Sequence, residues 1–253
     1  MDLKLADRRF LVGGASRGLG AAVARSLAAE GARVAGVSRT ADADDSRPAV
    51  SVAIAADLSD RDGPGNAVRA AVDALGGLDG LVVNSGGPPG GTFAAVDEAA
   101  WERAIAGTLQ STVRLIREAL PHLRDGRDPS IVIILSSSVR EPVPALITSN
   151  VLRPGLAGLI KTLVGEIAPI RINGVAPGRF DTDRVRSLDA ARAAASGLAI
   201  EVVQAQTRDR IPLGRYGDPD ELGRVVAFLL SPAASYVDGV ILSIDGGMIR
   251  SLP

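Results

Sequence analysis

Short apolar runs alternate with Ala-rich segments along almost the whole chain. Several runs are continuously apolar, as in residues 131–135 (Ile-Val-Ile-Ile-Leu), which is typical of strands buried on both faces. Strands that alternate with helices predict an α/β fold, a doubly wound parallel sheet with helices on both faces. About seven strands are expected, at 10–12, 33–37, 50–55, 81–83, 131–135, 170–175 and 240–244. Helices are expected at 19–30, about 64–75, about 97–123, about 150–168 and 219–230.

Nothing in the pattern divides the chain, so a single domain over 1–253 is expected, with neither an internal repeat nor a linker. The first half, about 1–130, contains the glycine-rich turn described below, and the second, about 131–253, contains the remaining polar candidates. The longest insertion is 179–212, and its Ala-rich stretch at 189–206 is expected to be helical. Because it leaves the carboxyl end of a strand, we expect this lid to cover a ligand crevice.

Composition excludes several classes of protein. The chain has 28 Lys and Arg against 29 Asp and Glu, a net charge of −1, so bulk charge favours neither nucleic acid nor an anionic membrane as a partner. Its apolar runs are far shorter than a membrane span, and charged residues interrupt any N-terminal signal pattern, so a cytoplasmic protein is expected. No cysteine and a single histidine, His122, predict no metal site. The acidic stretch 40–48 is interpreted as a solvated loop.

A glycine-rich turn at 13–20 follows the first apolar run and opens the first expected helix. Glycines there let the backbone take positive φ and let a ligand approach without meeting a Cβ atom. The start of the helix offers free N–H groups and the positive end of the helix dipole to a diphosphate. A strand before the turn, a helix after it and a second strand at 33–37 are the context that a dinucleotide site requires.

The spacing Gly14-x-x-x-Gly18-x-Gly20 resembles the Thr-Gly-x-x-x-Gly-x-Gly motif of the short-chain dehydrogenases/reductases, with Gly13 in place of the Thr. The resemblance spans essentially the whole chain and is closest to the 3-oxoacyl-carrier-protein-reductase-like branch. It implies a single Rossmann-type domain that binds a nicotinamide dinucleotide. The cofactor-binding residues that it implies are Gly14, Ser16, Arg17, Gly18, Leu19, Gly20, Ser38, Arg39, Asp57, Leu58, Asn84, Ser85, Gly86, Pro177, Gly178 and Thr182.

The residue after the second strand bears on which nucleotide is bound. An NAD-selective member of the family usually has Asp or Glu there, whereas this chain has Arg39, with Arg17 in the glycine turn. Two guanidinium groups suit a 2′-phosphate, which arginine binds bidentately. NADP(H) is therefore favoured over NAD(H), the alternative being that one of these arginines is only solvated.

The resemblance breaks at the catalytic residues. The family uses a Tyr and, four residues later, a Lys on the same helical face, with a Ser about thirteen residues before the Tyr to hold the substrate oxygen. Anchored on 155–161, the Tyr position falls on Ser149 and the Lys position on Arg153. The Ser position falls on Ser136, which is kept, and a helical Asn of the family is replaced by Thr108.

These replacements change what the site can do. A serine hydroxyl is a far weaker acid than a phenol, so Ser149 cannot inherit the role of the Tyr. Arg153 can hydrogen-bond ribose hydroxyls, but a guanidinium does not readily give up its proton. Pro154 is expected to bias Arg153 away from helical angles unless both lie where a helix begins. Other proton donors considered are Tyr216 and Tyr236, the only tyrosines, and Glu141 if burial raises its pKa.

Three functions remain open from the sequence. The first is an NADP(H)-dependent oxidoreductase that acts on a carbonyl or alcohol, 3-oxoacyl-like or another ketone, with an atypical proton path through water, Ser136, Ser149 or Arg153. The second is a dinucleotide-binding sensor or partner subunit without chemistry. The third is a non-redox lyase or isomerase on the same scaffold. Ser136 and Thr182 favour chemistry, because a sensor has less need of a group that holds a substrate oxygen.

The resemblance also implies a homo-oligomer, a tetramer or dimer. The helices at 97–123 and 150–168 would pack across one interface, and the last strand with the tail across another. In the lid, Phe180, Leu188, Leu198 and Ile200 indicate an apolar small-molecule ligand.

Overall fold

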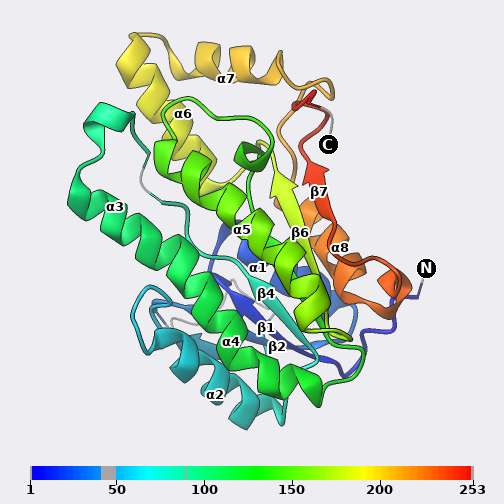
Figure 1. Ribbon diagram of the computed structural model, residues 1–253. Helices are drawn as coiled ribbons and strands as arrows, with labels where there is room; N and C mark the ends of the chain where they lie inside the picture. The colour runs from blue at the N-terminus through cyan, green and yellow to red at the C-terminus, as the bar shows by residue number, and fades with distance from the viewer. Residues whose placement is uncertain (1, 41–49, 89, 252–253) are drawn as a thin grey trace.

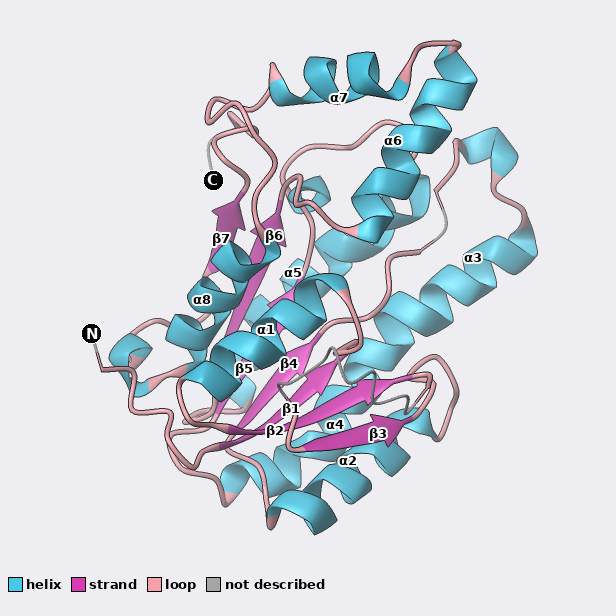
Figure 2. Cartoon of the chain, turned by 180° about the vertical axis from the view of Figure 1, so that it is seen from behind, coloured by secondary structure: helices cyan, strands magenta, loops and turns pink. Residues whose placement is uncertain are grey.

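A single parallel sheet forms the centre of the molecule (Figure 2). The computed structural model describes residues 2–40, 50–88 and 90–251; the acidic stretch expected at 40–48 lies, apart from Thr40, outside them. Within these residues the sheet has seven strands in the order β3-β2-β1-β4-β5-β6-β7, every neighbouring pair parallel. The strands are β1 (Arg9–Gly13), β2 (Arg33–Ser38), β3 (Val52–Ala55), β4 (Gly80–Val83), β5 (Ser130–Ile134), β6 (Arg171–Pro177) and β7 (Ile241–Ile244). The predicted doubly wound α/β fold is confirmed.

Helices follow the strands in the predicted alternation (Figure 1). They are α1 (Gly18–Ala29), α2 (Gly63–Leu75), α3 (Glu98–Ala104), α4 (Ser111–Arg124), α5 (Ile147–Glu166), α6 (Asp183–Ser196), α7 (Ile200–Arg208) and α8 (Pro219–Leu230). The start of α8 shows why such boundaries can be predicted. Asp218 accepts a hydrogen bond from the backbone N–H of Asp220, at 2.9 Å, while Glu221 accepts one from the N–H of Asp218, at 2.7 Å. With Pro219 at the first helical position, every local signal agrees.

Two apolar layers, one on each face of the sheet, make up the core. Along β1, Leu11 points into the layer shared with α2, α4 and α5, whereas Phe10 and Val12 point into the layer shared with α1 and α8. Figures 1 and 2 show these two sets of helices on opposite faces. Because successive side chains of a strand point to opposite faces, a strand covered on both sides must be apolar throughout. This is the reason for the continuous runs in the sequence.

The helix α5 runs without a break through Pro154, so the expected departure of Arg153 from helical angles is wrong. Proline inside a helix costs about 3 kcal/mol. Against that cost, Leu152, Leu156 and Ile160 are buried on the same helix, and burial of one such side chain is worth roughly 1.5–3 kcal/mol. Packing therefore outweighs the local penalty, and Arg153 lies in the second turn of a 20-residue helix.

Two other helices differ from the expected segments. The helix expected at 97–123 is interrupted at Ile105–Gln110 by a π-helical segment, which carries Thr108. In the lid, the helix expected at 189–206 is divided by Gly197, which takes φ = 67° and ends α6 before α7 begins. Figure 1 shows α6 and α7 beyond the tips of β6 and β7, so the lid lies at the carboxyl edge of the sheet.

At the opposite edge of the sheet, where the strands begin, Asp79 links the start of β1 to the loop before β5 by hydrogen bonds. Its carboxylate is fully buried and accepts from the backbone N–H of Arg9 (2.9 Å), from Arg9 Nε (3.0 Å) and Nη2 (2.8 Å), and from the N–H of Arg127 (2.8 Å). Burial by itself would raise the pKa of Asp79, but these hydrogen bonds lower it from 3.8 to about 2. The carboxylate therefore stabilises the fold in its ionised form.

The Asp79→Asn variant is expected to lose about 2 kcal/mol of unfolding free energy at pH 7, since one pKa unit corresponds to 1.36 kcal/mol. Because the pKa of Asp79 is lower in the folded chain than in the unfolded one, the ionised carboxylate stabilises the fold above about pH 4. This contribution is lost as the pH falls toward 2 and the carboxylate takes up a proton. Urea unfolding measured from pH 7 to pH 2.5 should show a stability difference that shrinks with acid. The Asp181→Asn variant, which removes an exposed ion pair with Arg186, is the control and should change little. A constant difference across the pH range would contradict this account.

Candidate active site

A cleft of about 1040 Å³ opens at the carboxyl edge of the sheet, where β1 and β4 lie side by side and the strand order reverses direction. In doubly wound sheets ligands bind at such a switch point. The loops after β1, β2, β4, β5 and β6 all reach this cleft, and the lid covers part of it. Its lining includes the three predicted catalytic residues, Ser136, Ser149 and Arg153, and every predicted cofactor residue except Gly20.

The glycine turn brings the backbone of β1 against that of β4. Gly14 has φ = 60°, and a Cβ atom placed on it would lie 2.7 Å from Nδ2 and 2.9 Å from the carbonyl oxygen of Asn84. Gly20 is buried beneath the turn, where a Cβ atom would overlap the carbonyl of Gly14. Gly20 thus allows close packing of α1 and does not itself line the cleft. At the N-cap of α1, Arg17 is extended and its side chain caps no N–H group, so the helix start is open to an anion.

The polar groups after β2 and β3 form the far end of the cleft. Asp57 accepts from the hydroxyl of Ser59 (2.6 Å) and from its backbone N–H (2.9 Å). These hydrogen bonds, and more weakly the charge of Arg39, lower the pKa of Asp57. Arg17 and Arg39 line the same cleft as this carboxylate, as the resemblance requires of the adenosine end.

A group of hydroxyls lies where β5 meets α5. Ser136 Oγ accepts from the backbone N–H of Ser138 at 3.1 Å, and Ser138 Oγ lies 3.1 Å from Ser149 Oγ. The hydroxyl of Thr108, on the π-helical segment, is buried without a hydrogen-bond partner among the described residues. Ser136, Ser149 and Thr108 line the cleft together, so the positions aligned with the family's catalytic groups do come together in space. The bridging role of Ser138 was not predicted, because nothing in the pattern separates it from Ser137.

Arg153 is buried, with 6% of its surface exposed, and its guanidinium donates to the carbonyl of Ile134 at the end of β5. Its Nε atom is buried with no hydrogen-bond partner in the described part of the chain. Burial, and to a smaller extent the charge of Arg184, lowers the pKa of Arg153 to about 10. Arg153 is therefore a cation at neutral pH.

The other proton donors considered from the sequence are not placed for that role. Tyr216 lies outside the cleft and donates to Asp189 at 2.7 Å; burial and that carboxylate raise its pKa. Tyr236 is fully exposed, also outside the cleft. Glu141 does line the cleft but is exposed, so the burial on which its role depended is absent.

Arg184, in the first turn of α6, is a cleft residue that the sequence analysis missed. Its guanidinium donates to the carbonyls of Gly87 (3.1 Å) and Pro88 (2.9 Å), and a Cβ atom on Gly87 would overlap it. Burial lowers its pKa. The helix α6 carries three arginines, Arg184, Arg186 and Arg192, and nothing in the sequence separates Arg184 from the other two, so only the Gly-Gly pair at 86–87 could have hinted at this packing.

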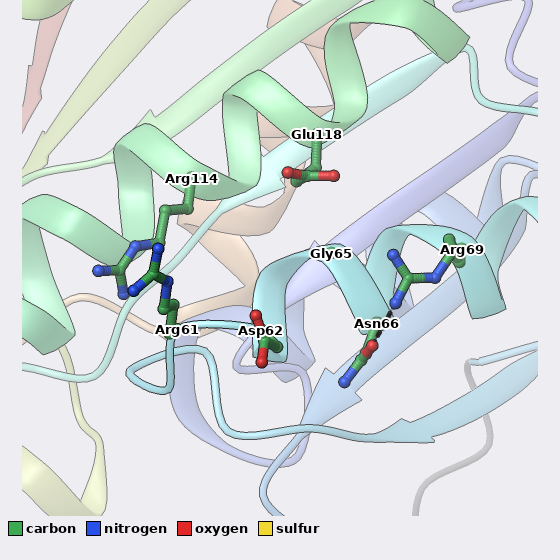
Figure 3. Close-up of a pocket in the computed structure, with 7 residues that line it drawn as sticks. All are labelled: Arg61, Asp62, Gly65, Asn66, Arg69, Arg114 and Glu118. Carbon is green, nitrogen blue, oxygen red and sulfur yellow. Dashed lines mark hydrogen bonds between the residues drawn. The ribbon is translucent and has the colours of Figure 1, made fainter.

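A second, smaller cavity lies between α2 and α4 (Figure 3). Figure 3 shows side chains of both charge signs around it, and none belongs to the motifs discussed above. Its lining is Arg61, Asp62, Gly65, Asn66, Arg69, Arg114 and Glu118. Because positive and negative groups are mixed there, this cavity selects no class of ligand.

No described helix is long and apolar enough to cross a membrane. Across the same residues, no three His, Cys, Asp or Glu side chains are grouped as they would be to hold a metal ion.

A family model described as enoyl-(acyl carrier protein) reductase matches residues 14–249. The chain belongs to the short-chain dehydrogenase/reductase family and is an oxidoreductase of that family. The resemblance stated from the glycine motif is thereby confirmed at the level of the family.

Three similar proteins show the range of the family. Cis-4-hydroxycyclohexanecarboxylate dehydrogenase of Sinomonas cyclohexanicum is 34% identical, over 98% of this chain and 98% of its own. The 3-oxoacyl-[acyl-carrier-protein] reductase MabA of Mycobacterium bovis is 30% identical, over 96% of this chain and 93% of its own. The structure of L-sorbose reductase from Gluconobacter frateurii, complexed with NADPH and L-sorbose, superposes with a TM-score of 0.92 at 26% identity, covering 100% of both chains.

The Gly14→Ala variant is expected to bind the nicotinamide dinucleotide at least about 10-fold more weakly, because positive φ strains an alanine and its Cβ would displace Asn84. Gly76→Ala is a matched control: Gly76 also has positive φ, at 79°, but a Cβ there meets nothing and lies at the end of α2. Titration of each variant, followed by nucleotide fluorescence, distinguishes them. Equal losses of affinity in both would show that strain alone, away from the cleft, is responsible.

Proposed function

We propose that this protein transfers a hydride between NADP(H) and a carbonyl or alcohol substrate, by a proton path that uses no tyrosine. One observation carries the proposal: a single continuous cleft joins the glycine turn and Arg39 to Ser136, Ser149 and Arg153. A dinucleotide with its phosphates at the glycine turn and Arg39 would extend along the cleft and bring its nicotinamide to the hydroxyls of Ser136 and Ser149. A relative of known structure, L-sorbose reductase, was crystallised with NADPH.

The residues present fit the dinucleotide. The turn at Gly14 lacks the side chain that would block a close approach, and the open start of α1 suits a diphosphate. Arg17 and Arg39 suit the additional 2′-phosphate of NADP(H). When bound, the nicotinamide would supply or accept the hydride, and the chain's residues hold the substrate and manage the proton.

Ser136 is the group that would hold the substrate oxygen. Its Oγ already accepts from the N–H of Ser138, which leaves its own O–H free to donate into the cleft. In the reductive direction the carbonyl carbon receives the hydride and the oxygen must receive one proton. A serine is too weak an acid to be the ultimate donor. The proton therefore comes from water in the cleft and is relayed by the hydroxyl of Ser149, which lines the cleft and which the hydroxyl of Ser138 holds at 3.1 Å.

Arg153 would orient the ligand in place of the family's lysine. Its guanidinium is fixed by the carbonyl of Ile134 and lies one helical turn after Ser149. As a cation it attracts a negatively charged group of the ligand without giving up its own proton.

Substrates differ among the relatives, which by their names act on a carboxylated cyclohexanol, a thioester-linked 3-oxoacyl chain and a sugar. For this chain a 3-oxoacyl-like compound or another ketone is proposed. Of the four apolar lid residues, only Phe180 and Leu188 line the cleft, beside several arginines, so the expectation of a purely apolar ligand is not supported.

A cytoplasmic homo-oligomer, dimer or tetramer, is part of the proposal. Val151 on α5 is 54% exposed, and Cβ atoms on Gly155 and Gly158 would meet open space. Such a face of a helix, smooth and partly apolar, allows close approach of another helix.

The direct test is to titrate the purified protein with NADPH and NADH and then add 3-oxoacyl thioesters and aromatic ketones. Tight binding of NADPH with oxidation of the nucleotide on at least one ketone is expected. Tight binding without turnover across the panel would instead indicate a sensor, an interpretation that the replaced Tyr and Lys favour. Failure to bind either nucleotide would contradict both.

The Ser136→Ala variant is expected to reduce kcat about 100-fold or more, as seen when a donor to a developing oxyanion is removed. Its affinity for NADPH should be unchanged, because Ser136 holds the substrate oxygen and not the nucleotide. The Ser196→Ala variant is the control, since that hydroxyl bonds only its own helix, at 2.8 Å to the carbonyl of Arg192. Single-turnover kinetics and fluorescence titration measure the two quantities. Full activity in Ser136→Ala would show that Ser136 does not hold the substrate oxygen.

The Arg39→Ser variant is expected to weaken NADPH binding about 10- to 100-fold while leaving NADH binding unchanged, because it removes charged hydrogen bonds to the 2′-phosphate. The Arg69→Ser variant on α2, remote from the cleft, should change neither affinity. The ratio of the two dissociation constants is the measurement. An unchanged ratio in Arg39→Ser would mean that Arg39 is only solvated.

A further inference from the structure

Two arginines at the catalytic end of the cleft have no acidic partner. Arg153 and Arg184 both line the cleft, and each is held by backbone carbonyls, Ile134 for the first and Gly87 and Pro88 for the second. Neither takes part in an ion pair among the described residues. The carboxylates that line the same cleft are Asp57, Glu141 and Asp183, and the last of these pairs with Arg186.

Two cations so arranged are costly in the free protein. Arg153 is buried and its Nε has no hydrogen-bond partner in the described part of the chain. The charge of Arg184 is close enough to disfavour the charge on Arg153. A buried charge is normally neutralised by a partner, and a second positive charge lining the same cleft adds to the cost. A ligand anion placed between the two guanidinium groups would remove both penalties at once.

The nucleotide is poorly suited to be that anion. Its phosphates have their own partners in this cleft, at the start of α1 and at Arg17 and Arg39. Arg153 instead lies one helical turn after Ser149. Its guanidinium bonds the carbonyl of Ile134, at the end of β5 and two residues before Ser136. The ribose and carboxamide of a nicotinamide at that end carry no negative charge. The anion that remains is the substrate.

We propose that the substrate is a short oxo acid, or the matching hydroxy acid, whose carboxylate is held by Arg153 and Arg184 while Ser136 holds the reacting oxygen. The inference rests on the proposed function and names its substrate class. Arg153 is hydrogen-bonded to the carbonyl of Ile134, two residues before Ser136, so a carboxylate held by Arg153 lies near the reacting oxygen. In 2-oxo and 3-oxo acids the two groups are separated by only a few bonds, and these acids are the class proposed. In the forward direction the oxo acid gains the hydride from NADPH at carbon and a proton from water at oxygen, and the carboxylate is unchanged.

Two arginines also fit the task chemically. A guanidinium presents paired N–H donors in the geometry of a carboxylate, and such charge-assisted pairs are stronger than neutral hydrogen bonds. Arg184 comes from the first turn of the lid helix α6, and its hydrogen bonds to the carbonyls of Gly87 and Pro88 already hold its guanidinium in place before an anion binds.

The test compares a series of 2-oxo and 3-oxo acids with their methyl esters, using kcat/KM with NADPH and, separately, calorimetric binding to the protein with and without NADP⁺. The acids should bind and react about 10- to 100-fold better than the esters, the range expected of hydrogen bonds to a charged group. The Arg184→Met variant should remove most of this preference and leave the dissociation constant of NADPH unchanged. Arg153→Met should also remove the preference for acids if the variant folds, and Arg184→Met keeps the test decisive if it does not.

Arg186→Met is the matched control, because Arg186 lies half a turn further along α6, outside the cleft, and pairs with Asp181 and Asp183. It should retain the full preference for acids. If the esters react with the same kcat/KM as the acids, the inference is overturned and the proposed function stands. If no compound causes oxidation of NADPH, the result counts against the proposed function. Calorimetry still tests the anion site in that case: acids that bind no better than esters would exclude it. Loss of NADPH affinity in Arg184→Met would assign the pair to the phosphates of the nucleotide instead.

Discussion

The close contact between the glycine turn after β1 and Asn84 after β4 is the constraint on which the site depends. At Gly14 and Gly20 a side chain would displace Asn84 or the turn itself. The contact sits where the order of the sheet reverses, so it fixes the position of the open start of α1 relative to the ends of β4 and β5. The parallel strands hold the other loops of the cleft at set positions relative to this contact.

Charge is the second determinant of the site. At the base of the sheet, buried charge is compensated: Asp79 accepts four hydrogen bonds and pairs with Arg9. At the carboxyl edge, by contrast, Arg153 and Arg184 are held only by carbonyl groups. The first arrangement stabilises the folded chain, and the second leaves positive charge unsatisfied in a cleft. A difference of this kind within one protein indicates where a charged ligand belongs.

The fold followed from the sequence because the signals were local and agreed with one another. Continuous apolar runs marked strands covered on both faces, and Asp218 with Pro219 marked the start of α8. The glycine spacing then indicated the family. The continuation of α5 through Pro154 was not predictable, because it depends on the burial of Leu152 and Leu156 against distant strands. Arg184 was missed for a related reason: its role arises from packing against Gly87, almost a hundred residues away in the chain.

The central claim is that a cleft without the family's tyrosine and lysine still carries out hydride transfer. NADPH that carries two deuterium atoms at nicotinamide C4, incubated with the protein and the panel of oxo acids and ketones, tests it most directly. The account predicts that mass spectrometry finds one deuterium on the carbinol carbon of the alcohol formed, in proportion to the NADPH oxidised. Tight binding of the deuterated nucleotide with no deuterium in any product would contradict the claim.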